Sequence, residues 1–123
     1  MKNAMGAAIL IASCLLSAKI NAAVVYPVRP IEGYACGKLA MSAKEAEDFH
    51  FSVPIRVSPS PDAPVGTLAA SVLLLKSPAH EIAGFVEVLQ LNGKAGWIEK
   101  SRVRPFDGLC RPSLLSNGRI GFS

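Results

Sequence analysis

The chain has 123 residues, half of them apolar, with 13 basic and 9 acidic side chains and a net charge of +4. That length corresponds to one small domain, and the apolar fraction is sufficient for a packed core. The basic residues form no long cluster and are not interleaved with aromatic ones, which argues against a nucleic-acid-binding surface.

The first 22 residues have the pattern of a secretory signal peptide. Lys2 supplies a basic start, residues 5–18 are uncharged and mostly apolar, and Ala22 is a small residue at a cleavage position. The apolar run is shorter than the roughly 20 residues that cross a bilayer, so we expect cleavage after Ala22 and no membrane span in the mature form. Cleavage removes Lys2 and Lys19 and leaves 11 basic and 9 acidic side chains, a net charge of +2.

A second route of processing is considered because residues 11–14 read Ile-Ala-Ser-Cys, which has the form of a lipobox. In a lipoprotein, Cys14 would be acylated and would become the first residue. The apolar segment before Cys14 is very short, however, and apolar residues continue after it. The sequence therefore favours export in soluble form, to the periplasm or the extracellular space, over a lipid anchor.

The mature chain keeps two cysteines, Cys36 and Cys110. An even number in an oxidising compartment predicts one disulfide between them. Closing a loop of roughly 75 residues contributes about 4 kcal/mol in the chain-entropy treatment. The pair lacks a CxxC spacing, and His50 and His80 show no spacing to it that suggests zinc, so we expect neither a redox motif nor a metal site.

Residues 23–51 form a predicted N-terminal extension. Pro27 and Pro30 favour an extended or irregular course at its start. Ser42 followed three residues later by Glu45 is a capping box and favours a short helix. A charged surface loop fits this segment equally well, because isolated helices of this length are marginal.

The segment 52–106 carries most of the strand and turn signals. Three prolines in Ser58–Pro64 lack an N–H, so this piece is predicted to be an irregular loop and not a central strand. Residues 72–75 form an apolar run that is followed by a turn region at 77–80. These features predict a β-rich domain.

A hairpin is the clearest fold signal. Val and Phe in Phe85–Val88 favour a strand, and Ala95–Ile98 returns as its partner. Between them, Asn92-Gly93 predicts a type I′ turn because both residues tolerate positive φ. A short polar piece and Pro105 follow the second arm.

The hairpin's Asn-Gly-Lys-Ala-Gly-Trp-Ile sequence resembles that of the bacterial SH3-like (SH3b) family. The opening pattern of the family is similar to residues 53–60, and its Val-Gly-Thr-Leu motif is similar to Val65–Leu68. The chain departs from the family at Ser58 and Ser71, where the family usually has glycine. The resemblance implies a mainly β fold, a small SH3-like five-stranded barrel over residues 52–106 with the Pro-rich loop as the counterpart of the RT loop. Residues 107–123 are then a C-terminal extension packed on the barrel.

The apolar runs at residues 73–75 and 88–89 would be apolar on both faces of a sheet, so the second face needs a cover. Asn117-Gly118 is a second turn signal, and the end of the chain is expected to fold back as a hairpin arm. A partner interface is the alternative cover. The residues expected to supply the internal cover, held close by the disulfide, are Tyr26, Tyr34, Leu114, Leu115, Ile120 and Phe122.

Three basic residues alternate at Lys100, Arg102 and Arg104. In an extended segment, this spacing places the three cations on one face. A solvated face is the ordinary interpretation of such a short run, and an anion site is the alternative.

The sequence indicates a non-catalytic protein without a cofactor. It contains no nucleophile elbow, no phosphate-binding glycine loop and no metal motif, and its acidic residues are scattered. The resemblance implies a binding module for cell-wall peptide or an extended envelope peptide or protein. The predicted ligand-binding residues are Trp97, Phe85, Phe49, Phe51 and Pro59.

Two alternatives stay open at this point. A lone aromatic residue at strand spacing more often fills a core, so Trp97 is also a candidate core residue whose loss would unfold the domain. The alternative function is a periplasmic inhibitor of a lysozyme or another wall hydrolase, which would insert Ser58–Pro64 or residues 77–81 into an enzyme cleft.

Overall fold

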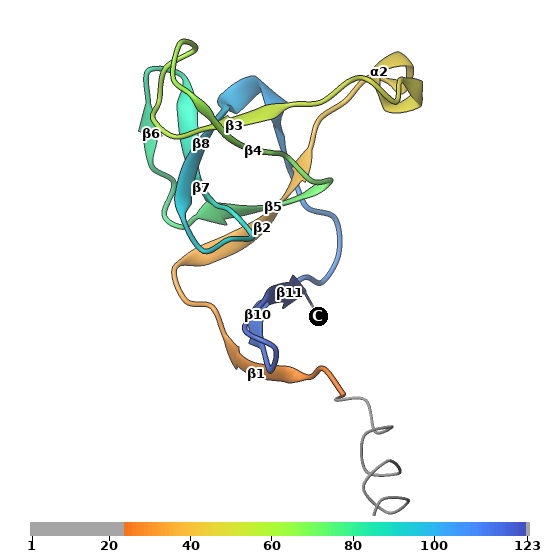
Figure 1. The fold of residues 1–123 in the computed structure, drawn as a ribbon, viewed down its shortest axis with the longest axis vertical. Helices are drawn as coiled ribbons and strands as arrows, with labels where there is room; N and C mark the ends of the chain where they lie inside the picture. The colour runs from red at the N-terminus through yellow and green to blue at the C-terminus, as the bar shows by residue number, and fades with distance from the viewer. Residues whose placement is uncertain (1–23, 123) are drawn as a thin grey trace, which may run out of the picture.

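The computed structural model describes residues 24–122, and the predicted signal peptide and Cys14 lie outside this range. The described chain is mainly β, as predicted, and its strands form two antiparallel sheets (Figure 1). None of the helices in this part of the chain is long and apolar enough to cross a bilayer.

The larger sheet has eight strands in the order β4-β3-β8-β7-β5-β2-β9, with the short β6 paired to β7. The smaller sheet has three strands in the order β1-β10-β11 and lies below the larger one in Figure 1. The strands are β1 (Pro27–Pro30), β2 (Tyr34–Leu39), β3 (Pro54–Arg56), β4 (Val65–Leu68), β5 (Val72–Lys76), β6 (Glu81–Ile82), β7 (Phe85–Leu89), β8 (Ala95–Glu99), β9 (Val103–Pro105), β10 (Pro112–Leu115) and β11 (Ile120–Phe122). The helices are α2 (Ala43–Glu47) and the 3-10 turn η1 (Lys100–Arg102).

The larger sheet is not closed into a barrel, which corrects the prediction of a five-stranded barrel. Its end strands are β4 and β9, and β9 has only three residues and pairs along one edge with β2. No ladder joins β4 to β9 in the part of the chain that the structure describes. Two further backbone bonds only lengthen pairs inside the sheet: Leu39 N to Ser71 O (2.9 Å) extends the β2–β5 pair, and Ala69 N to Val53 O (2.8 Å) extends the β3–β4 pair. The predicted N-terminal extension instead contributes β2 to the sheet, between β5 and β9.

The hairpin of β7 and β8 forms, but its turn differs from the predicted type. Gly93 has a φ of +85°, whereas Asn92 has no positive φ, so the turn is not type I′. Gln90 N donates to Lys94 O, and Gly93 N donates to Gln90 O, both at 2.9 Å. These bonds describe a three-residue loop that ends in a left-handed glycine.

The core lies on one face of the larger sheet. Directly opposite residues of antiparallel strands share a face, and residues two apart along a strand do too. Val88 and Ile98, both without exposed surface, therefore lie on the core face of β7 and β8. The buried residues of this cluster are Leu39, Val53, Ile55, Leu73, Val88 and Ile98.

The opposite, outer face is apolar around β5 and β7 as well. Leu74 is only 2% exposed there, next to Cys36 on the neighbouring strand. Phe122 shares a cavity of about 140 Å³ with Leu74 and Leu89, so the C-terminal segment lies beside these residues as expected. Tyr26 is more than half exposed, so little of its surface contributes to the predicted cover.

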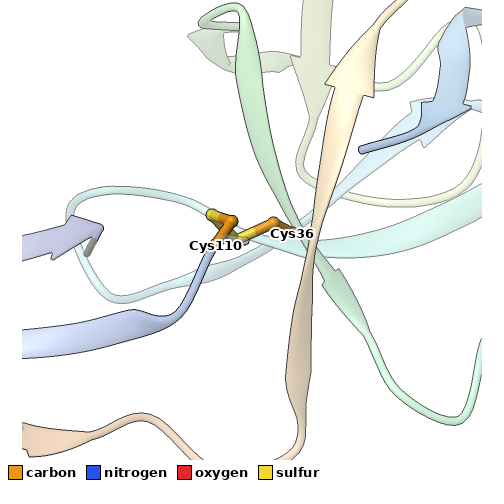
Figure 2. The surroundings of a disulfide bond; sticks show 2 residues. All are labelled: Cys36 and Cys110. Atoms are coloured by element: carbon orange, nitrogen blue, oxygen red, sulfur yellow. A yellow bond between two sulfur atoms is a disulfide. The ribbon is translucent and has the colours of Figure 1, made fainter. Parts of the chain in front are cut away.

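The predicted disulfide is present between Cys36 in β2 and Cys110 just before β10 (Figure 2). Their Cα atoms are 6.1 Å apart, and the residues are separated by 74 positions in the sequence. The bond therefore ties the C-terminal segment to the larger sheet. Such a pair is compatible with an oxidising, exported location.

Helix α2 stands apart from the strands on an arm of residues 40–51 (Figure 1). The predicted capping box forms, since Ser42 N donates to Glu45 Oε1 (2.9 Å) and Glu45 N donates to Ser42 Oγ (3.1 Å). Arg102 holds the arm against η1 by donating to both oxygens of Glu45, at 3.0 and 3.1 Å. Its guanidinium also lies 5.1 Å from the ring centroid of Phe51. The bond from Arg102 lowers the pKa of Glu45 from 4.5 to about 2.

Replacing Cys36 by Ser should lower the free energy of unfolding by up to about 4 kcal/mol, because the unfolded chain regains the entropy of an open loop. Urea unfolding of the variant and the wild type checks this value. Cys110→Ser should have the same effect, and reduction of the wild type should reproduce it. Equal stability of the oxidised and reduced wild type would contradict a stabilising role of the bond.

Glu45→Gln should make the unfolding free energy less sensitive to acid. The folded-state pKa of Glu45 is lowered, so ionised Glu45 stabilises the folded state above pH 4.5, and this contribution is lost as the pH falls toward about 2. Urea unfolding between about pH 5 and pH 2 measures the difference. Glu47→Gln on the same helix is the control and should keep the wild-type slope; an equal slope in Glu45→Gln would contradict the prediction.

Candidate functional site

A row of polar and aromatic side chains crosses the outer face of the larger sheet. Tyr34 is opposite Lys76, and Glu87 is opposite Trp97, which in turn is opposite Arg56. An ion pair of 3.5 Å between Lys76 Nζ and Glu87 Oε2 links the two halves of the row. The row lies on the face opposite to the core and spans five neighbouring strands of the sheet, from β2 to β3.

Glu87 is the buried centre of this row. It is 9% exposed, and its Oε1 lies 2.8 Å from Nδ1 of His80. The hydrogen bond with His80 lowers the pKa of Glu87, burial acts in the opposite direction, and the charge of Lys76 lowers the pKa further. Since an ionised carboxylate only accepts hydrogen bonds, Nδ1 of His80 carries the proton of this bond.

His80 connects the carboxylate to Trp97. The two rings contact edge to face, with centroids 5.1 Å apart and an interplanar angle of 65°. The side chain of His80 is 47% exposed, and Trp97 is half-buried. We call Lys76, His80, Glu87 and Trp97 the His80–Trp97 cluster. The cluster exposes part of two aromatic rings to solvent, and the carboxylate of Glu87 lies beside them.

Trp97 is not part of the core. It faces away from Ile98 and Val88, because neighbouring residues of a strand point to opposite faces. The expectation that Trp97 fills the core is therefore corrected. The alternation of β8, in which Gly96 and Ile98 are buried and Trp97 is not, is the physical reason.

A cavity of about 590 Å³ adjoins the cluster. Three of its wall residues, Lys76, His80 and Glu87, belong to the cluster. The other residues that line it are Leu75, Ala79, Val86, Lys100, Ser101, Val103 and Arg104. The site thus combines an exposed aromatic pair with a recess that has apolar and basic walls.

The five residues predicted to bind a ligand lie in different places. Only Trp97 belongs to the cluster, whereas Phe85 is buried at the start of β7 and Phe49 is fully exposed on the arm. Phe51 packs against the core, and Pro59 is half-buried in the Pro-rich loop. They do not form one groove, and their role in ligand binding stays a prediction.

The three alternating cations have different partners in the structure. Lys100 Nζ lies 2.9 Å from Glu81 Oε1, and Arg102 binds Glu45. Arg104 donates to the backbone oxygens of Ser101 and Val103, at 3.3 and 3.1 Å. The 3-10 turn Lys100–Arg102 interrupts the extended course that the period-two pattern assumes, so the three cations do not form one row.

Sequence reasoning missed Lys76, His80 and Glu87 as members of a site. One signal was available, since Glu87 is a lone charge within the apolar strand Phe85–Leu89. A charge in such a strand requires a partner if it is buried. In the part of the chain that the structure describes, no group of three or more metal-ligating side chains occurs.

Trp97→Ala should leave the protein folded and should cost less stability than Ile98→Ala. Removing the fully buried Ile98 creates a cavity in the core and should cost about 3 kcal/mol, whereas the half-exposed Trp97 gives up less buried area and should cost about 1–2 kcal/mol. Urea unfolding of both variants tests the order. A larger loss of unfolding free energy for Trp97→Ala than for Ile98→Ala would show that Trp97 is a core residue.

Comparison with known proteins places the chain in no established group. No family model, curated protein or solved structure matches it at a significant level.

Proposed function

We propose that the protein is an exported, non-catalytic SH3-like binding module that recognises a cell-wall peptide or another extended envelope peptide. The SH3b resemblance of residues 52–106 supports this family and ligand class. The resemblance also implies a one-turn helix and a short final barrel strand after the hairpin, and the hairpin β7–β8 is followed by the 3-10 turn η1 and the short strand β9.

The observation that carries the proposal is the exposed aromatic pair of the His80–Trp97 cluster. Trp97 lies between the strand that carries Arg56, at the base of the Pro-rich loop, and His80 from the loop after β5. Extended peptides bind between two such loops by stacking on aromatic rings and by hydrogen bonds to their backbone. With Nδ1 committed to Glu87, Nε2 of a neutral His80 is a hydrogen-bond acceptor.

The location follows from the N-terminal pattern and the cysteines. Residues 1–22 are proposed to be removed, which leaves a chain with one disulfide in the periplasm or outside the cell. A lipid anchor at Cys14 is the alternative. The intact mass of the exported protein distinguishes the two, because an acylated chain would begin at Cys14.

A second function is favoured by the order of the Pro-rich loop. Val57 N donates to Pro64 O at 3.0 Å, and Arg56 Nη1 donates to Ala63 O, also at 3.0 Å. Both bonds fix the base of the loop, and fixed loops are suited to insertion into an enzyme cleft. A periplasmic inhibitor of a lysozyme or wall hydrolase is therefore the alternative, and it requires a one-to-one protein complex without affinity for the wall.

The proposal is tested by sedimentation of the exported protein with purified, insoluble peptidoglycan. The wild type should co-sediment, and His80→Ala should lose at least about tenfold in affinity because the aromatic pair is broken. His50→Ala is the matched control, since His50 is exposed on the arm and lies outside the cluster.

Phe49→Ala tests a predicted ligand-binding residue that lies outside the cluster, because Phe49 is fully exposed on the arm. Loss of binding in Phe49→Ala but not in His80→Ala would move the binding site to the arm and contradict the assignment. A wild type that stays in the supernatant and forms a tight complex with lysozyme would support the inhibitor instead. Urea unfolding of each variant confirms that it is folded.

A further inference from the structure

The cavity beside the His80–Trp97 cluster has an apolar floor formed by the edge of the core. Leu75, Val86 and Val103 pack against the core cluster, and each is only partly buried. All three line this cavity. The core is therefore open to solvent on this side, in a recess that is large enough for a small part of a ligand.

The charges around this floor are mostly positive. Lys76, Lys100 and Arg104 line the cavity with a single acidic residue, Glu87. Lys76 and Glu87 compensate one another at 3.5 Å, and Lys100 pairs with Glu81 at 2.9 Å. The surplus charge is thus that of Arg104.

Arg104 contacts no carboxylate among the side chains that the structure describes. Its Nη1 donates to backbone oxygens of Ser101 and Val103, and its side chain is exposed at the edge strand β9. A guanidinium carries five N–H donors, so several remain for an anion. The planar fork of Arg fits the two oxygens of a carboxylate better than a lysine ammonium does.

We infer that this cavity binds the C-terminal end of a peptide, with the free carboxylate on Arg104 and a small apolar side chain on the floor of Leu75, Val86 and Val103. The inference rests on the proposed peptide-binding function and specifies its ligand: an extended peptide that ends in a small apolar residue. The preceding residues of the peptide would then pass His80 and Trp97, because His80 lines both the cavity and the aromatic pair.

The experiment compares four probes: the acetylated dipeptide Ala-Ala as the free acid and as the C-terminal amide, each in the L and the D form. Binding is measured by the heat of titration, and the fluorescence of the one tryptophan, Trp97, is followed beside it because its ring contacts His80 at the cavity wall. At least one free acid should bind about tenfold more tightly than its amide, because the amide lacks the charge-assisted hydrogen bonds. Arg104→Gln should abolish this preference.

Arg119→Gln is the matched control, since Arg119 is an exposed arginine in the C-terminal hairpin, and it should keep the preference. Equal affinity for acid and amide, absence of binding by all four probes, or an unchanged preference in Arg104→Gln would each overturn the inference. If the wild type is retained on peptidoglycan but gives any of these results, the proposed function still holds and only the C-terminal carboxylate is excluded as the bound group. If the wild type is not retained on peptidoglycan but prefers the free acid to the amide, the carboxylate site is supported and the cell wall is excluded as the source of the ligand.

Discussion

The strand β7 is buried on both of its faces, and the arrangement of the molecule depends on this constraint. Val88 points into the core without exposed surface, while Phe85 and Glu87 are buried on the outer face. A sheet with one buried face packs only against its core. A strand that is buried on both faces, such as β7, needs other segments of the chain to cover its second face. Here the cover comes from segments far from it in sequence, the loop that carries His80 and the C-terminal segment that the Cys36–Cys110 bond holds against the sheet.

The buried charge of Glu87 determines how the loop after β5 is placed. An isolated carboxylate in a protein interior is strongly unfavourable, so it is kept only with partners that hydrogen bond to it. His80 and Lys76 supply these partners. Because His80 is fixed by the carboxylate, its ring is also fixed against Trp97 and at the wall of the cavity. The candidate site is thus a consequence of satisfying one buried charge.

Local features of the chain were predictable from sequence, and most non-local ones were not; the Cys36–Cys110 bond was predictable because these are the only two cysteines after residue 22. The capping box at Ser42 and Glu45 and the hairpin around Gly93 depend on residues a few positions apart. The turn type was not predictable, because Asn-Gly occurs both in type I′ turns and before a left-handed glycine in three-residue loops. The bond between Glu45 and Arg102 and the insertion of β2 join segments that are far apart, and no local pattern encodes such pairings. The cluster around Glu87 was missed for the same reason, although its lone charge gave a hint.

The position of β2 between β5 and β9 also has a consequence for the order in which the protein can form. Strand β2 precedes both of its neighbours in the chain, since β5 begins at Val72 and β9 only at Val103. Until both arrive, the two edges of β2 carry unpaired backbone groups that can associate with other chains. Sheets built from such distant pairs form slowly, so the chain is most exposed to aggregation early in folding, when β2 and Cys36 both await partners from the last quarter of the chain.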